Sequence, residues 1–205
     1  MWSSLFHRRI DVLVTILVVG VAAGMFVATA VHAVWFAPEL QVAPSGIAPA
    51  TTTPQSAPVR LIIPSLGIDA NIQYVGLSYI GHNIGVPNNF IDVAWYKYGT
   101  VPGEQGTAII DGHVDNGLSL AGVFKHLNTI TPGAHIYVLT QSGKKLQFVV
   151  TDVQSYPYQS VPMGEILSAN DAARLDLITC DGGWVAGQRT YDHRLVVYTE
   201  LQSSS

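Results

Sequence analysis

The chain has 205 residues, and its 14 acidic and 10 basic side chains give a formal net charge of −4. This balance, with a sequence pI near 5.9 and no run of Lys or Arg, argues against a nucleic-acid-binding surface. The length predicts one domain of ordinary size with appendages. The mean hydropathy of +0.30 is high for a soluble protein, and one N-terminal apolar segment accounts for much of it.

This apolar segment, residues 12–37, is long enough to cross a hydrocarbon core of about 30 Å as one helix. Arg8 and Arg9 precede it, and the next basic residue lies far beyond it. The positive-inside rule therefore predicts that residues 1–11 form a cytoplasmic tail and that the bulk of the chain lies outside. A cleaved signal peptide is the alternative, because residues 28–30 (Ala-Thr-Ala) loosely resemble a cleavage site.

Residues 38–58 are rich in Pro, Ala and Thr, with five prolines spread along the segment. Such a composition cannot form a hydrophobic core and favours extended conformations. We expect a spacer there that holds the following domain, residues 59–205, away from the bilayer.

Short strands separated by Gly and Pro turns dominate this domain. Strands are expected at residues 60–63, 68–75, 107–110, 135–140, 146–153, 175–179 and 194–199. Ser142-Gly143 is a hairpin signal. Short helices are expected at residues 120–127 and 168–173. The pattern predicts a mostly β fold, a closed or nearly closed β-barrel with short helices.

Cys180 is the only cysteine of the chain, and it ends an apolar strand-like run. A lone thiol cannot form an internal disulfide, so it is either an inert buried residue or a nucleophile. His113 ends another such run, and Arg194 opens a third. A thiol nucleophile needs a nearby base or cation to populate the thiolate, and it needs a way to stabilise an oxyanion. His113 and Arg194 therefore favour the nucleophile.

The ordered set of motifs resembles the sortases, the membrane-anchored cysteine transpeptidases of Gram-positive-type bacteria. Residues 177–180 (Leu-Ile-Thr-Cys) match the Leu-x-Thr-Cys signature, Gly112-His113 matches the family's histidine, and Arg194 matches its arginine. The resemblance extends over about residues 59–201 and includes residues 60–64, 95–96 and 102–106. Residues 112–116 and 179–183 look most like class F and the related class D, although Asp176 stands where the family often has Thr.

The resemblance implies a sortase-like closed barrel and covalent thioacyl transfer. Cys180 is the implied nucleophile, His113 the general acid and base, and Arg194 the group that stabilises the oxyanion or the substrate. The implied reaction cleaves a Leu-Pro-x-Thr-Gly-like sorting signal between Thr and Gly. The acyl group then passes to an amine of a cell-wall precursor or a pilin. Electrostatics supports a thiolate nucleophile, because a cation near the sulfur lowers the pKa of the thiol.

The implied location is the cell membrane of a Gram-positive-type bacterium. The protein would cross the membrane once, with its N-terminus in the cytoplasm and its catalytic domain outside. Its implied partners are surface proteins that carry sorting signals, together with a peptidoglycan precursor or a pilin amine. Housekeeping attachment and pilin polymerisation both remain open.

The resemblance also implies two walls of a groove for the sorting signal. Residues 156–167 align with the loop that forms one wall, and residues 181–191 are expected to form a loop on the other, with Trp184 as a lid. The hydroxyl of Thr179 is expected to orient the substrate or His113. The residues expected to contact the substrate are Thr179, Val161, Pro162, Met163, Ile166 and Trp184.

No metal and no other cofactor is expected. His113 and Asp115 could share a face and be read as metal ligands, but a hydrolytic metal centre usually needs more ligands than this segment offers. No dense acidic cluster like the calcium loop of class A sortases is visible. Two rival functions remain: a non-catalytic, anchored sortase-like module that binds peptides, and a metal-dependent hydrolase.

Overall fold

A computed structural model of the chain describes residues 56–77, 84–116 and 120–202. The predicted cytoplasmic tail and transmembrane anchor, and most of the predicted spacer, lie outside these residues. Within the described part of the chain, no helix has the length and apolar character needed to cross a membrane.

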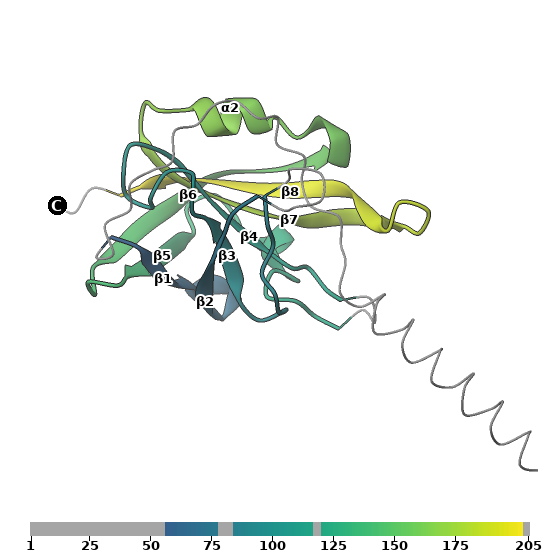
Figure 1. Cartoon of the computed structure of the whole chain (residues 1–205), viewed down its shortest axis with the longest axis horizontal. Helices are drawn as coiled ribbons and strands as arrows, with labels where there is room; N and C mark the ends of the chain where they lie inside the picture. Colours follow the sequence, from purple (N-terminus) through teal and green to yellow (C-terminus); the bar gives the residue numbers. More distant parts are fainter. Residues whose placement is uncertain (1–55, 78–83, 117–119, 203–205) are drawn as a thin grey trace, which may run out of the picture. The chain divides into compact units, whose positions relative to one another are not determined.

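Eight strands form a closed barrel in the order β1-β2-β3-β4-β7-β8-β6-β5 (Figure 1). The strands are β1 (Pro58–Ile63), β2 (Ile68–Val75), β3 (Val93–Tyr96), β4 (Gly106–Gly112), β5 (His135–Thr140), β6 (Lys145–Pro157), β7 (Ala173–Val185) and β8 (Thr190–Leu201). Neighbouring strands are antiparallel except for β2–β3 and β4–β7, which are parallel. The prediction of a mostly β, closed barrel is confirmed.

Two apolar clusters lie on opposite sides of the barrel wall. The first fills the interior and includes Leu175 and Leu177 of β7. The second lies outside the wall and includes Ile178 of β7 and Ile109 of β4. Strands that are buried on both faces read as continuous apolar runs, which explains why β4 and β7 lack the alternation seen in β5. The outer cluster supports the part of β7 that leads to Cys180.

The helical elements are short. They are α2 (Met163–Ser168) and the 3₁₀ turns η1 (Pro64–Leu66), η2 (Leu127–Thr129) and η3 (Tyr158–Ser160). Met163 and Ile166 lie on one face of α2 and are buried in the outer cluster. Figure 1 shows α2 over one side of the barrel, where it packs against β4.

Both helices predicted from the sequence are wrong in position. Residues 120–127 form turns that lead into η2, because the backbone N–H of Gly122 donates to Val114 O at 2.9 Å and ties the segment to the chain after β4. The second helix ends at Ser168, where it was expected to begin. Its start is set by the burial of Met163 and Ile166, three residues apart, rather than by a polar cap.

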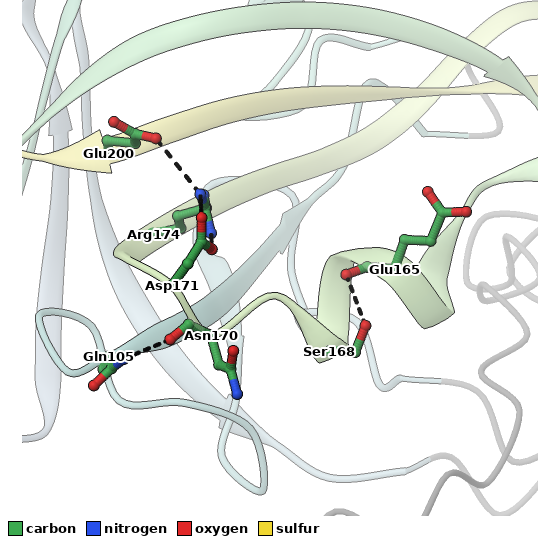
Figure 2. A network of polar contacts seen from close by, with 7 residues as sticks. All are labelled: Gln105, Glu165, Ser168, Asn170, Asp171, Arg174 and Glu200. Atoms are coloured by element: carbon green, nitrogen blue, oxygen red, sulfur yellow. Dashed lines mark hydrogen bonds and ion pairs between the residues drawn. The ribbon is translucent and has the colours of Figure 1, made fainter.

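The chain between α2 and β7 is held by polar contacts (Figure 2). Arg174 forms ion pairs with Asp171 and with Glu200 of β8, the second at 3.6 Å. Gln105 Nε2 donates to Asn170 O at 2.6 Å, which fixes the segment against the chain before β4. These contacts anchor the first end of β7, far along the strand from Cys180.

β7 and β8 continue well beyond the predicted strands. They pair from Arg174↔Glu200 to Val185↔Thr190, so most of the loop expected at residues 181–191 is instead a hairpin. Figure 1 shows this hairpin extending past the other strands. A bulge interrupts the pairing between Asp181 and Trp184. Gly182 has φ +79° there, a conformation in which any other residue would be strained, and a Cβ would also displace the Asp192 carboxylate.

Candidate active site

Cys180 and Arg194 lie directly opposite each other on neighbouring antiparallel strands, β7 and β8. Cys180 is half-buried, and Arg194 is buried. Residues that are directly opposite in an antiparallel pair have Cβ atoms about 4.5–5.5 Å apart and share one face of the sheet. The register therefore brings together two of the three residues that the sequence predicted to act on a substrate.

His113 follows β4, the other neighbour of β7. The parallel pairing runs from Gly106↔Ala173 to Asp111↔Ile178. The same register, continued by two residues, puts His113 level with Cys180. The two strands thus deliver the imidazole and the thiol to the same edge of the barrel, with Arg194 on the far side of β7.

Thr179 fastens β7 to β4 at this edge. Its side chain is buried, and its hydroxyl donates to Gly112 O at 2.7 Å, one residue before His113. Of the two roles expected for Thr179, this geometry favours the orientation of His113 over contact with a substrate.

A loop after β2 holds the imidazole of His113. Pro87 O lies 3.0 Å from His113 Nε2, and the ring of Phe90 lies 4.8 Å from the imidazole, centroid to centroid. A carbonyl oxygen only accepts, so Nε2 carries a hydrogen, and Nδ1 is the nitrogen that exchanges a proton. Burial lowers the pKa of His113 below its usual range, and the Pro87 carbonyl and the charge of Asp115 oppose this shift.

Arg194 is oriented by two backbone carbonyls, a hydroxyl and an aromatic ring. Nη1 donates to His193 O at 2.8 Å and to Tyr191 O at 3.1 Å. Nη2 donates to Thr190 Oγ1 at 2.8 Å. The guanidinium carbon lies 4.3 Å from the ring centre of Tyr158. A guanidinium that is held on several sides keeps one orientation, which suits a group that must present donors at a fixed position.

The thiol of Cys180 is protonated in the resting site. Burial raises its pKa to about 11, and Arg194 is the group that opposes this shift. The carboxylates of Asp111, Asp115 and Asp181 raise the pKa further. Because the pKa of His113 is lowered, the neutral thiol and the neutral imidazole are the main forms near pH 8. The thiolate–imidazolium pair is then a minor form of the site.

Four residues that contact Arg194 or His113 were not predicted from the sequence to do so. The ring of Tyr158 and the hydroxyl of Thr190 hold Arg194, while Pro87 and Phe90 hold His113. None of these residues belongs to a motif, and their approach depends on the barrel register. Tyr158 and Thr190 lie within the two segments that were expected to form the groove, residues 156–167 and 181–191, but neither residue was singled out.

The residues expected to contact the substrate are not all exposed. Met163 and Ile166 are buried in the outer cluster, whereas Val161 and Pro162 are half-buried beside it. Trp184 is 51% exposed and makes an edge contact with Tyr191, with 5.5 Å between ring centres. The substrate-contacting roles of these residues remain predictions.

Metal-binding side chains do not gather in the described residues, where no group of three or more His, Cys, Asp or Glu is arranged to hold an ion. Asp115, which the sequence could present as a ligand, instead accepts from Tyr191 and pairs with Lys125. The expectation that no cofactor is needed remains a prediction.

The fold and this site together describe a thiol enzyme built on a closed β-barrel. A family model described as the sortase domain matches residues 61–202. The chain therefore belongs to the sortase family, whose members are cysteine transpeptidases that act on sorting-signal substrates and amine acceptors. No curated protein matches the chain.

Solved sortase structures share the fold. Sortase C-1 from Actinomyces oris is 23% identical with a TM-score of 0.54, and the match covers 71% of this chain and 73% of that one. Sortase A from Corynebacterium diphtheriae is 17% identical with a TM-score of 0.55, covering 73% of this chain and 62% of that one. Sortase C from Clostridium perfringens SM101 is 19% identical with a TM-score of 0.52, covering 73% and 72%. At these identities the likeness shows the fold alone, and the class F or D placement remains a prediction.

Proposed function

We propose that this sortase acts at the outer face of the cell membrane, anchored by residues 12–37, with its N-terminus in the cytoplasm. It cleaves a Leu-Pro-x-Thr-Gly-like signal between Thr and Gly and joins the new carboxyl end to an amine. The amine belongs to a cell-wall precursor or to a pilin. The bacterium is of the Gram-positive type.

One observation carries the catalytic part of this proposal. The register of β7 with its two neighbours brings Cys180 opposite Arg194 and level with His113. This pairing puts a nucleophile on β7, a hydrogen-bond donor on β8 and a proton donor directly after β4, at one edge of the barrel. A peptide carbonyl bound at that edge would meet all three requirements of acyl transfer.

The first half-reaction forms the thioacyl-enzyme. The Cys180 thiolate attacks the carbonyl carbon of Thr, and the C–N bond to Gly breaks. Nδ1 of the His113 imidazolium gives its proton to the leaving amine. Arg194 donates to the oxygen that carries the developing negative charge, or to the backbone beside it.

The second half-reaction reverses the proton path. The acceptor amine attacks the thioester carbon and gives a proton to Nδ1 of His113. The carbon–sulfur bond breaks and returns the thiolate. Because the first step needs the thiolate together with the imidazolium, and the second step regenerates that pair, we expect activity to fall below the lowered pKa of His113 and above the raised pKa of Cys180, about 11.

The experiment uses the full chain in detergent, a library of Leu-Pro-x-Thr-Gly peptides and a glycine amine, read by intact-mass spectrometry. We expect cleavage after Thr, an adduct on Cys180 and an amine-ligated product. Ligation with one amine class identifies the acceptor. Folded protein with an accessible thiol but no adduct would reject the proposed reaction and favour the peptide-binding module.

Cys180→Ala provides the sharpest control. The substitution removes the only thiol of the chain, so turnover should drop to the background rate while the thermal unfolding midpoint stays close to that of the parent. Appreciable peptide cleavage by this variant would exclude thioacyl catalysis. Sensitivity of the parent to a chelator would instead support a metal-dependent hydrolase.

A further inference from the structure

The loop that begins at His113 contacts the β7–β8 hairpin, which carries Arg194. We propose that Tyr191 and Asp115 form a positioning bridge that holds the His113 loop against this hairpin, and that Asp115 sets the pH range in which the site works. The proposal rests on the proposed function for its turnover readout only.

The bridge is a hydrogen bond between two segments that are distant in the sequence. Tyr191 OH lies 2.6 and 2.7 Å from the two carboxylate oxygens of Asp115. Lys125 Nζ lies 3.0 Å from the same carboxylate, whose side chain is only 8% exposed. A hydrogen bond to a charged group contributes more than one between neutral groups, and it is most specific when it is shielded from water.

Each end of the bridge leads directly to a residue of the site. Asp115 is two residues from His113, and Tyr191 is three residues from Arg194. The carbonyl of Tyr191 also accepts from Arg194 Nη1 at 3.1 Å. A single residue thus contacts the guanidinium through its backbone and the His113 loop through its hydroxyl. The distance between the acid and the oxyanion donor therefore depends on Tyr191.

The His113 loop is shaped to stay close to this bridge. Phe124 N–H donates to His113 O at 2.9 Å, and Gly122 N–H donates to Val114 O at 2.9 Å. A Cβ on Gly122 would collide with the carbonyl of His113, so the returning chain passes as close as glycine allows.

The charge of Asp115 acts on both proton-carrying groups. It opposes the lowering of the His113 pKa, and it raises the pKa of Cys180 together with Asp111 and Asp181. Arg194 opposes these carboxylates at the thiol, and the thiolate in turn raises the pKa of the Tyr191 hydroxyl. Removing the charge of Asp115 should therefore lower the pKa values of both His113 and Cys180. Both limits of the pH range of activity should then move to lower pH.

Two substitutions separate the positioning role from the charge. Tyr191→Phe keeps the ring and the carboxylate but removes the hydrogen bond. We expect kcat to fall about 10- to 100-fold with KM nearly unchanged, because small displacements of a catalytic group are costly. Asp115→Asn keeps a hydrogen-bonding side chain but removes the charge. We expect its pH–rate profile to move to lower pH.

Two matched controls remove a hydroxyl and a carboxylate that lie outside the bridge. Tyr198→Phe removes another hydroxyl of β8, one that lies 3.0 Å from Tyr156 OH. Asp171→Asn removes another carboxylate that is paired with a cation, at the opposite end of β7. Both should keep the kcat and the pH profile of the parent.

The second readout needs no substrate. The rate of iodoacetamide alkylation of Cys180 in the full chain, followed against pH, reports the thiolate directly. Its midpoint should move to lower pH in Asp115→Asn and stay in place in Asp171→Asn. An unshifted midpoint, or a Tyr191→Phe enzyme within about twofold of the parent kcat, would overturn the inference. If the parent turns over no peptide, the proposed function fails, while alkylation still decides the role of Asp115.

Discussion

Two arginines of the β7–β8 pair are held in opposite ways. Arg174, at the first end of β7, pairs at the surface with the carboxylates of Asp171 and Glu200 (Figure 2). Arg194, opposite Cys180, is buried and donates to two carbonyls and a hydroxyl while its guanidinium lies over Tyr158. An exposed ion pair is screened by water, whereas a buried guanidinium depends on each of its partners. An arginine thus stabilises the first end of β7 in one case, and in the other it lies opposite the proposed nucleophile.

This difference predicts unequal responses to one conservative change. Arg→Lys keeps the charge but loses the planar fork of donors. At Arg194 the fork reaches His193 O, Tyr191 O and Thr190 Oγ1 at once, and a lysine ammonium cannot reproduce that geometry. The two substitutions therefore compare a positioned charge with a surface charge.

The largest effect is expected for Arg194→Lys. We expect kcat to fall about 10²- to 10³-fold, the range typical of losing an oxyanion donor. Steady-state kinetics with the peptide and amine chosen by the library experiment would measure it. A kcat close to that of the parent would remove Arg194 from the chemistry and leave it as a structural residue.

Asp176 extends the comparison to a buried acid on the same strand. It is 1% exposed, and Thr199 N–H approaches it at 3.4 Å. Burial raises its pKa from 3.8 to about 7, while Thr199 and Arg174 oppose the shift. Between these two pH values the unfolded chain has lost the proton that the folded chain keeps. Stability is therefore greatest at low pH and falls as the pH rises toward 7.

Asp176→Asn should remove most of this pH dependence. In the parent chain, the loss between pH 5 and pH 8 is on the order of 3 kcal/mol if this acid alone is counted. Urea unfolding of the full chain at the two pH values would measure it. Relative to the parent, the variant should gain more stability at pH 8 than at pH 5. If the free energies of unfolding of variant and parent differed equally at both pH values, the Asp176 carboxyl would not be held protonated in the folded chain.

The sequence predicted the barrel because its strands differ in how they alternate. β5 alternates between buried and less buried residues, whereas β4 and β7 carry runs of consecutive buried residues, so the sequence pattern reveals both kinds of strand. The two short helices were misplaced because a helix of one or two turns has little periodicity to detect. β3 was missed because four buried residues between loops look like many other apolar runs.

The predicted site follows the same division. The sequence singled out Cys180, His113 and Arg194 because each ends or begins an apolar run and fits a known spacing. The bridge between Tyr191 and Asp115 was not predicted, because it forms only when the β7–β8 hairpin extends past the barrel and meets the His113 loop. Contacts that depend on strand register and hairpin length are set by the whole fold rather than by a local motif.

The smallest effect is expected for Arg174→Lys, the counterpart of Arg194→Lys. Asp171 and Glu200 are 75% and 53% exposed, so water competes for both pairs. We expect kcat within about twofold of the parent and a thermal unfolding midpoint lowered by no more than about 2 °C. Added salt should reduce even this difference, because exposed charges are screened. If Arg174→Lys instead lost activity as Arg194→Lys does, burial would not be what separates the two arginines.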